Sequence, residues 1–313
     1  MALDEIDQPV ADTDAALHDS PSQAGRRSAM RQFGLRAAGA VATAAAASLV
    51  AAPRAEAQGL TDTAILNFAL NLEYLEAEYY LRAFFGYGIT GVAGNNGVGG
   101  TGTQGSVTGG SQVPFQSSAI QAYAESLAAD ESTHVQLLRN ALGSAAIAEP
   151  NIDLSTSFTT LALAAGLISP GQTFNPFADE ISFLLGSYIF EDVGVTAYAG
   201  AARYITSPNY VTAAAGILAI EAYHGGAIRT LLANIGGGQA ANAISALRAT
   251  LSGAQDDQGI IIPNESYNFV SSDYNGLVFR RTPAQVLAVV YGSPKAIGTG
   301  GLFFPTGLNG SIR

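Results

Sequence analysis

The sequence contains no cysteine and few charged residues. The absence of cysteine excludes disulfide bonds, zinc ribbons, iron–sulfur ligation and thiol catalysis. Only 12% of the 313 residues are charged whereas 48% are apolar, so the chain has ample material for a hydrophobic core and no signature of disorder. Histidine is scarce as well, with three residues in the whole chain, so the position of each one is informative.

Residues 1–57 are typical of an export signal. Arg26 and Arg27 follow an acidic lead, and the Ala-rich run at 37–52 is too short and too weakly apolar for a good membrane span. Ala55-Glu56-Ala57 fits a small-x-small cleavage site. The paired arginines resemble a twin-arginine signal, with a general secretory peptide or an uncleaved anchor as the alternatives. We therefore expect a periplasmic or extracellular protein with no stable membrane span after cleavage.

The chain that remains after cleavage is acidic. It has nine basic and 18 acidic residues, a net charge near −9. Because no basic stripe is left to follow a phosphate backbone, we expect no binding of nucleic acid.

Two Glu-x-x-His motifs are the main chemical signal. Glu131-Ser132-Thr133-His134 and Glu221-Ala222-Tyr223-His224 both lie in Ala/Leu-rich stretches with helical character. Residues three apart share one helix face, so each motif directs a carboxylate and an imidazole at the same point. A four-helix bundle that binds two metals needs one such motif from each of two helices and one glutamate from each of the other two.

The spacing of the glutamates indicates an internal repeat. Hydrophobic periodicity predicts four long helices, at about 65–85, 117–142, 177–205 and 211–235. Glu73 lies in the first and Glu191 in the third, so each half of the chain is a helical hairpin that supplies a glutamate and then a Glu-x-x-His motif. The first hairpin contains an additional Gly-rich insertion at 86–112, which is either a lid or partner-contact flap or a tolerated surface insertion.

Four carboxylates and two imidazoles suit two iron or manganese ions. Four glutamates neutralise the charge of two divalent ions, whereas without metal the clustered carboxylates would repel one another and take up protons. We therefore predict a di-metal centre with these ligands: Glu73, Glu131, His134, Glu191, Glu221 and His224.

Three further residues are candidates for supporting that centre. Glu76 shares a face with Glu73 and is either an alternative ligand, a residue that holds a histidine, or a solvated acid. Glu78 points elsewhere, and we expect it to be solvated. Tyr80 and Tyr198 lie near ligands by helical spacing, with ordinary aromatic packing as the alternative to a supporting role.

The remaining segments connect or extend the bundle at 58–238. A stretch at 144–176 is long enough to cross from one end of the bundle to the other, and it contains a short helix at about 159–167. The C-terminal extension at 239–313 contains a helix at 240–251, extended segments, and a helix at 284–291 that Thr282 caps. Its apolar tail at 300–305 is expected to pack on the bundle or on a neighbouring subunit.

At these residues the chain resembles the ferritin-like superfamily, and in particular the ferritin-like domain family that includes desiccation-related proteins. Residues 71–80 are close to that family's first-helix signature, both Glu-x-x-His motifs sit where its second and fourth helices carry theirs, and residues 281–287 and 301–305 look like segments of the desiccation-related members. The resemblance implies an all-α fold: a left-handed four-helix bundle with a long crossover between helices 2 and 3, plus an irregular C-terminal extension. It also implies that the six ligands hold a di-iron or di-manganese centre.

The superfamily does not fix the activity, because its members store iron, oxidise ferrous ions, disproportionate peroxide or oxygenate organic substrates. An exported chain with a long insertion and an extra C-terminal segment fits a storage cage poorly. We favour a di-metal oxidoreductase, catalase-like or ferroxidase-like, that acts on peroxide, dioxygen or ferrous ion in oxidative or desiccation stress. The alternative is a non-enzymatic stress or assembly protein in which metal only stabilises the bundle. The expected partners are metal ions with peroxide or dioxygen, and a homo-oligomer is left open.

Overall fold

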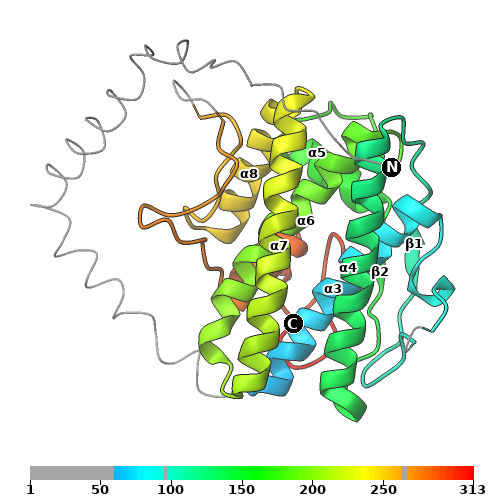
Figure 1. Cartoon of the computed structure of the whole chain (residues 1–313), viewed down its shortest axis with the longest axis vertical. Coiled ribbons are helices and arrows are strands. Elements are labelled where there is room, and N and C mark those ends of the chain that lie inside the picture. The colour runs from blue at the N-terminus through cyan, green and yellow to red at the C-terminus, as the bar shows by residue number, and fades with distance from the viewer. Residues whose placement is uncertain (1–59, 95–96, 263–266) are drawn as a thin grey trace, which may run out of the picture. The chain divides into compact units, whose positions relative to one another are not determined.

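The computed structural model describes residues 60–94, 97–262 and 267–313, and four long helices dominate this part of the chain (Figure 1). The predicted signal segment lies outside the described residues. The long helices are α3 (Asp62–Phe85), α4 (Ser118–Leu142), α6 (Glu180–Ala201) and α7 (Pro208–Asn234). α3 packs on α4, and α6 packs on α7, so the two predicted hairpins are present and together form the bundle. The all-α, ferritin-like fold predicted from the sequence is confirmed.

Local capping signals set most helix boundaries where we expected them from the sequence. The Thr61 hydroxyl accepts a hydrogen bond from the Ala64 backbone N–H at 3.1 Å, and Ser117 caps α4 in the same way. One boundary was wrong. The fourth helix begins at Pro208 rather than near residue 211, because proline lacks the N–H that the first turn of a helix leaves unpaired. α6 ends earlier, at Ala201, and continues as the 3-10 turn η3 (Ala202–Tyr204).

The Gly-rich insertion is attached to the crossover. The insertion contains η1 (Ile89–Gly91) and β1 (Val107–Gly109), and the crossover contains η2 (Gly143–Ala145), β2 (Ile152–Leu154) and α5 (Thr156–Ala164). β1 and β2 form a parallel pair with Val107 opposite Ile152. A Cβ atom at Gly105 would lie 2.2 Å from the backbone nitrogen of Asn151, so glycine is required for this close approach. The insertion is thus held to the crossover by paired backbone.

The C-terminal extension covers another part of the bundle. It contains α8 (Gly238–Ser252), α9 (Pro283–Val290) and η4 (Pro294–Ala296), and α9 begins with a capping box between Thr282 and Gln285. The Phe303 ring packs on Phe158 and Phe190, with centroid distances of 5.1 and 5.0 Å. The apolar tail therefore packs on the bundle of its own chain.

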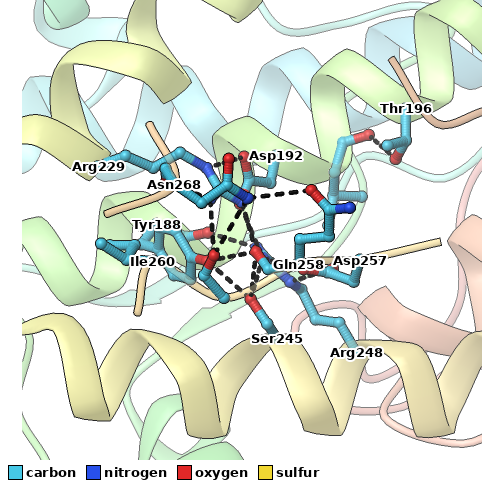
Figure 2. Close-up of polar contacts among 12 residues, drawn as sticks. Tyr188, Asp192, Thr196, Arg229, Ser245, Arg248, Asp257, Gln258, Ile260 and Asn268 are labelled. Carbon is cyan, nitrogen blue, oxygen red and sulfur yellow. Dashed lines mark hydrogen bonds and ion pairs between the residues drawn. The ribbon is translucent and has the colours of Figure 1, made fainter. Parts of the chain in front are cut away.

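A buried ion network ties the extension to the bundle, and Figure 2 shows Asp192, Arg229, Arg248 and Asp257 within it. No motif or period in the sequence indicated this network. Arg229 and Arg248 each donate to Asp192 at 2.8 Å, and Arg248 also lies 2.8 Å from Asp257. Arg281 completes the network by bonding Asp257 and the neighbouring Asp256 at 2.8 and 2.9 Å. Three acids and three arginines from α6, α7 and the extension thus neutralise one another away from water.

α7 is the one helix in the described ranges that is long and apolar enough to cross a membrane. Its buried positions include Glu221, His224 and Arg229, which contact the bundle interior and the ion network. Core helices of bundles pass the same test of length and composition, so we interpret α7 as a bundle helix.

Candidate metal centre

All six predicted ligands lie buried inside the bundle, and the structure brings them together as two groups that could each hold a metal ion. One group is Glu73, Glu131, His134 and Glu221, and the other is Glu131, Glu191 and His224. Within each group, one ligand atom per residue lies within 4.8 Å of the others. Glu131 belongs to both, so the two groups are adjacent and share a carboxylate.

Both histidines direct Nδ1 at two carboxylates. Nδ1 of His134 lies 3.0 Å from Oε2 of Glu131 and 3.3 Å from Oε2 of Glu73. Nδ1 of His224 lies 3.1 Å from Oε1 of Glu131 and 3.2 Å from Oε2 of Glu191. Each imidazole nitrogen therefore faces the point where carboxylates from two helices converge, which is the geometry that a shared cation requires.

Asp130 orients His224 and was missed in the sequence. Its Oδ2 lies 3.1 Å from Nε2 of His224, and its side chain is 46% exposed, so it sits between the imidazole and solvent. A carboxylate on the far ring nitrogen fixes the tautomer and ring orientation of a metal-binding histidine. The only hint in the sequence was that Asp130 directly precedes the ligand Glu131. Adjacent residues of a helix point about 100° apart, so this position alone does not show that Asp130 reaches His224.

Glu221 has no hydrogen-bond partner for either carboxylate oxygen among the described residues. It is fully buried, and a Cβ atom on Gly194 of α6 would lie 2.1 Å from its Oε2, so the carboxylate occupies space that only glycine leaves free. A buried carboxyl group without a donor is strongly destabilising. A cation at this point would satisfy it.

Two tyrosines hold the single glutamates of α3 and α6. The Tyr198 hydroxyl donates to Oε1 of Glu73, and the Tyr80 hydroxyl donates to Oε1 of Glu191 at 2.5 Å. All four residues are buried. Each bond occupies one carboxylate oxygen and leaves the other directed at an imidazole, so both tyrosines contact proposed ligands.

The acids of this centre outnumber its bases. Burial and neighbouring carboxylates raise the pKa of Glu221 well above its usual range, and burial raises the pKa of Glu73 to about 7. Burial also opposes the charge of Glu131, but its contacts with both histidines hold its pKa well below the usual range. Burial alone would lower the pKa of His134 and His224, yet the carboxylates raise their pKa values to about 11 and about 12. Two imidazolium protons thus compensate the carboxylates in the metal-free protein.

The two remaining glutamates of α3 differ from each other. Glu76 is buried near the centre but belongs to neither donor group. The expectation of a solvated Glu78 was wrong: its carboxylate is buried, accepts from Arg82 Nε at 2.7 Å and accepts from the Ile89 backbone N–H at 2.8 Å. Glu78 thereby fixes the start of the Gly-rich insertion, a role that helical spacing within α3 does not indicate.

The sequence model of the ferritin-like domain family matches residues 61–234, the part of the chain that supplies every proposed ligand. The chain belongs to this family. Among curated proteins, this ferritin-like chain is 29% identical over 270 residues to the ferritin-like catalase Nec2 of Nesocodon mauritianus, covering 80% of this chain and 84% of that protein. It is 33% identical over 250 residues to the desiccation-related protein PCC13-62 of Craterostigma plantagineum, covering 72% and 76%. No solved structure matches the chain.

The donor set fits iron or manganese better than other biological cations. It mixes carboxylate oxygen with imidazole nitrogen and contains no thiolate, which is the ligand pattern of these ions. Zinc sites seldom use this many carboxylates, and magnesium does not require paired histidines. The unpartnered carboxyl group of Glu221 is the structural feature that most directly favours a bound cation.

Proposed function

We propose that this ferritin-like protein binds two iron or manganese ions and carries out redox chemistry on hydrogen peroxide, dioxygen or ferrous ion. We favour disproportionation of hydrogen peroxide. The observation that carries the proposal is the pair of adjacent donor groups that share Glu131. The shared carboxylate and the two imidazoles would hold two ions close enough to act as one unit.

The chain's own residues would position the ions and exclude bulk water. The two carboxylate oxygens of Glu131 lie near Nδ1 of His134 and Nδ1 of His224, so this residue would help to hold both ions. Glu73 and Glu191 are each fixed by a tyrosine hydroxyl. The two metal ions, when bound, would store two electrons, so that one hydrogen peroxide is oxidised to dioxygen and a second is reduced to two waters. The two protons that the first peroxide releases are consumed by the second.

Similarity to a protein named ferritin-like catalase supports the choice of peroxide, and similarity to a desiccation-related protein supports a role in stress. We propose in addition that the N-terminal segment directs export, by the twin-arginine or the general secretory route, to the periplasm or the extracellular space. The protein would then remove peroxide outside the cytoplasm.

A non-enzymatic role is the second candidate. The paired insertion and the buried ion network bind the bundle to its peripheral segments, which suits a protein that persists under water loss. In that case the metal would only neutralise the buried carboxylates.

Metal analysis of the mature protein, purified from its own compartment, tests both candidates. The test variant is Glu131→Ala/His224→Ala, and the control is Glu125→Ala, which removes an exposed acid from the same helix. We expect about two iron or manganese ions per chain in the wild type and the control, and loss of both ions in the test variant because both groups need Glu131.

Peroxide and ferrous-ion turnover are then measured on the same samples. Turnover that disappears together with the metal supports the enzyme. Two bound ions without turnover favour the non-enzymatic candidate. A folded wild-type protein without metal after growth in iron and manganese would overturn the assignment of the site.

A further inference from the structure

α7 presents an uncharged face to solvent. Over its 27 residues it has three acidic or basic side chains, and all three (Glu221, His224 and Arg229) are buried. The side chains that α7 directs at solvent are therefore uncharged along the whole helix, a length of about 40 Å. Association through this face would not require a charged group to lose its hydration.

A groove runs between α7 and α4 on this side of the bundle (Figure 1). It has a volume of about 870 Å³, and none of its ten lining residues is acidic or basic. α4 contributes Ala119 and Tyr123, the C-terminal extension contributes Val270, and α7 contributes the rest. Most of the α7 walls are small residues, including Ala222 and Gly226, so the groove has room for a bulky side chain.

Large apolar side chains project beside the groove. Tyr223 is 77% exposed and Val270 is 68% exposed, although both line it. Tyr267 and Phe269, which precede Val270 in the extension, are also exposed, and their rings stack with a centroid distance of 5.8 Å. Exposed apolar surface that gathers in this way marks an association site.

Charge and shape both favour a second copy of this chain as the partner. Each copy has a formal net charge of −11, so two copies repel each other over most of their surfaces and can meet at the uncharged face without bringing like charges together. The groove and the projecting Tyr223 lie on the same surface, so each copy offers both a cavity and a side chain to fill it. An isologous two-fold interface requires this arrangement.

The face is also large enough for a stable dimer. A helix with its side chains is about 10 Å wide, so α7 and the neighbouring α4 together cover a surface about 40 Å long and about 20 Å wide. That is on the order of 800 Å², the area that each partner buries in a standard protein–protein interface.

We propose that this face is the two-fold interface of a homodimer, in which Tyr223 of each copy inserts into the groove between α4 and α7 of the other. Tyr223 is the anchor of the interface, because a large aromatic side chain that fills a pocket contributes most to association. The contact consists of uncharged side chains and needs neither metal nor turnover, so it does not depend on the proposed function.

Sedimentation equilibrium of the purified protein at micromolar concentrations measures the association. We expect a dimer for the wild type and a monomer for Tyr223→Asp, with association weakened about 100-fold or more, because the anchor is lost and a charge would enter an apolar groove. Circular dichroism should show that this variant is folded, since Tyr223 is largely exposed. Tyr87→Asp is the control: Tyr87 is an exposed tyrosine of the Gly-rich insertion and does not line the groove, so the dimer should persist.

Cross-linking tests the position of the interface independently. The chain has no cysteine, so Ala222→Cys supplies a single thiol in the groove and Leu163→Cys supplies a single exposed thiol on α5 as the control. A short bismaleimide should give a covalent dimer with Ala222→Cys and none with Leu163→Cys.

A monomeric wild type would overturn the proposal. That includes a monomer that floats with phosphatidylcholine vesicles, because the face would then bind a lipid surface. A dimer that Tyr223→Asp leaves intact, or equal cross-linking of the two thiols, would overturn it as well.

Discussion

Asp192 is the acid on which the buried ion network converges, and its replacement by asparagine is the sharpest test of how the extension is held. Its Oδ1 accepts from Arg229 Nε at 3.1 Å, and its Oδ2 accepts from Arg229 and Arg248, each at 2.8 Å. The Asp192→Asn substitution keeps the shape of the side chain and removes its charge. The change therefore isolates the electrostatic part of the interaction.

The expected destabilisation follows from what each arginine retains. Arg248 keeps Asp257 as an anionic partner. Arg229 keeps the backbone carbonyls of Gln258, Gly259 and Asn268 and its place over the Tyr188 ring, but it keeps no anionic partner among the described residues, so one fully buried guanidinium loses its counter-charge. Removing one partner of a buried ion pair costs about 3–5 kcal/mol. For a domain of this size, that corresponds to a fall in Tm of roughly 6–20 °C.

Urea and thermal unfolding of Asp192→Asn and wild type at equal metal content measure this difference. Burial opposes the charge of Asp192, but Arg229 and Arg248 lower its pKa below the usual value of 3.8. The stabilisation is therefore fully present above pH 3.8 and is lost as the pH falls through the lower, folded-state pKa. The gap between the proteins should be constant from neutral pH down to about 4 and should close below that.

Two comparisons make the result interpretable. Glu125→Gln, an exposed change, should alter the free energy of unfolding by less than about 0.5 kcal/mol. Combining Asp192→Asn with Arg229→Met should recover part of the loss, because the unpaired guanidinium is then gone. A destabilisation below about 1 kcal/mol for Asp192→Asn alone would refute the reasoning, since it would mean that Arg229 tolerates burial without a counter-charge.

Other buried groups give three more predictions. Burial and nearby Glu78 raise the pKa of Glu149 from 4.5 to about 8, so this residue destabilises the folded state as the pH rises from 4.5 to about 8. In urea unfolding, Glu149→Gln should therefore be more stable than wild type by on the order of 4 kcal/mol at about pH 9, and by much less at about pH 5. Metal binding at pH 7 should release about two or more protons, because His134 and His224 must lose theirs. Calorimetry in buffers of different ionisation enthalpy measures this number, and metal binding without proton release would contradict the proposed site. Gly194→Ala places a methyl group 2.1 Å from a ligand carboxylate and should weaken metal binding about 10–100-fold in a metal titration, with unchanged affinity as the contrary result.

The parts of the structure that were predictable are those that local rules determine. The Glu-x-x-His motifs, the hydrophobic periods of four helices and the caps at Thr61 and Ser117 all act over three or four residues. The pairing of the two hairpins followed from the repeat of the same chemical pattern. These rules were enough to predict that Glu73 and Glu191 lie beside the two Glu-x-x-His motifs in the interior of the bundle.

The parts that were not predictable depend on contacts between distant segments. Asp192 and Arg248 are 56 residues apart, and no period or motif connects them. Glu78 is buried because the insertion folds back to donate a backbone N–H to it, which changes the surroundings of a face that helical spacing alone assigns to solvent. The parallel pairing of β1 with β2 likewise joins two segments that read as separate loops.

A comparison between the buried ion network and the acidic cluster of the bundle interior bears on the metal. In the ion network, three aspartates face three arginines, and every acid has a cationic partner. In the bundle interior, five buried glutamates (Glu73, Glu76, Glu131, Glu191 and Glu221) face two histidines, and no lysine or arginine forms an ion pair with any of them in the described part of the chain. The buried aspartates of the ion network are thus paired with arginines, whereas the buried glutamates of the bundle interior are not. The interior cluster therefore has more carboxyl groups than cationic partners. In the protein without metal, protons on the carboxyl groups and imidazoles neutralise this charge, and two divalent ions would replace those protons.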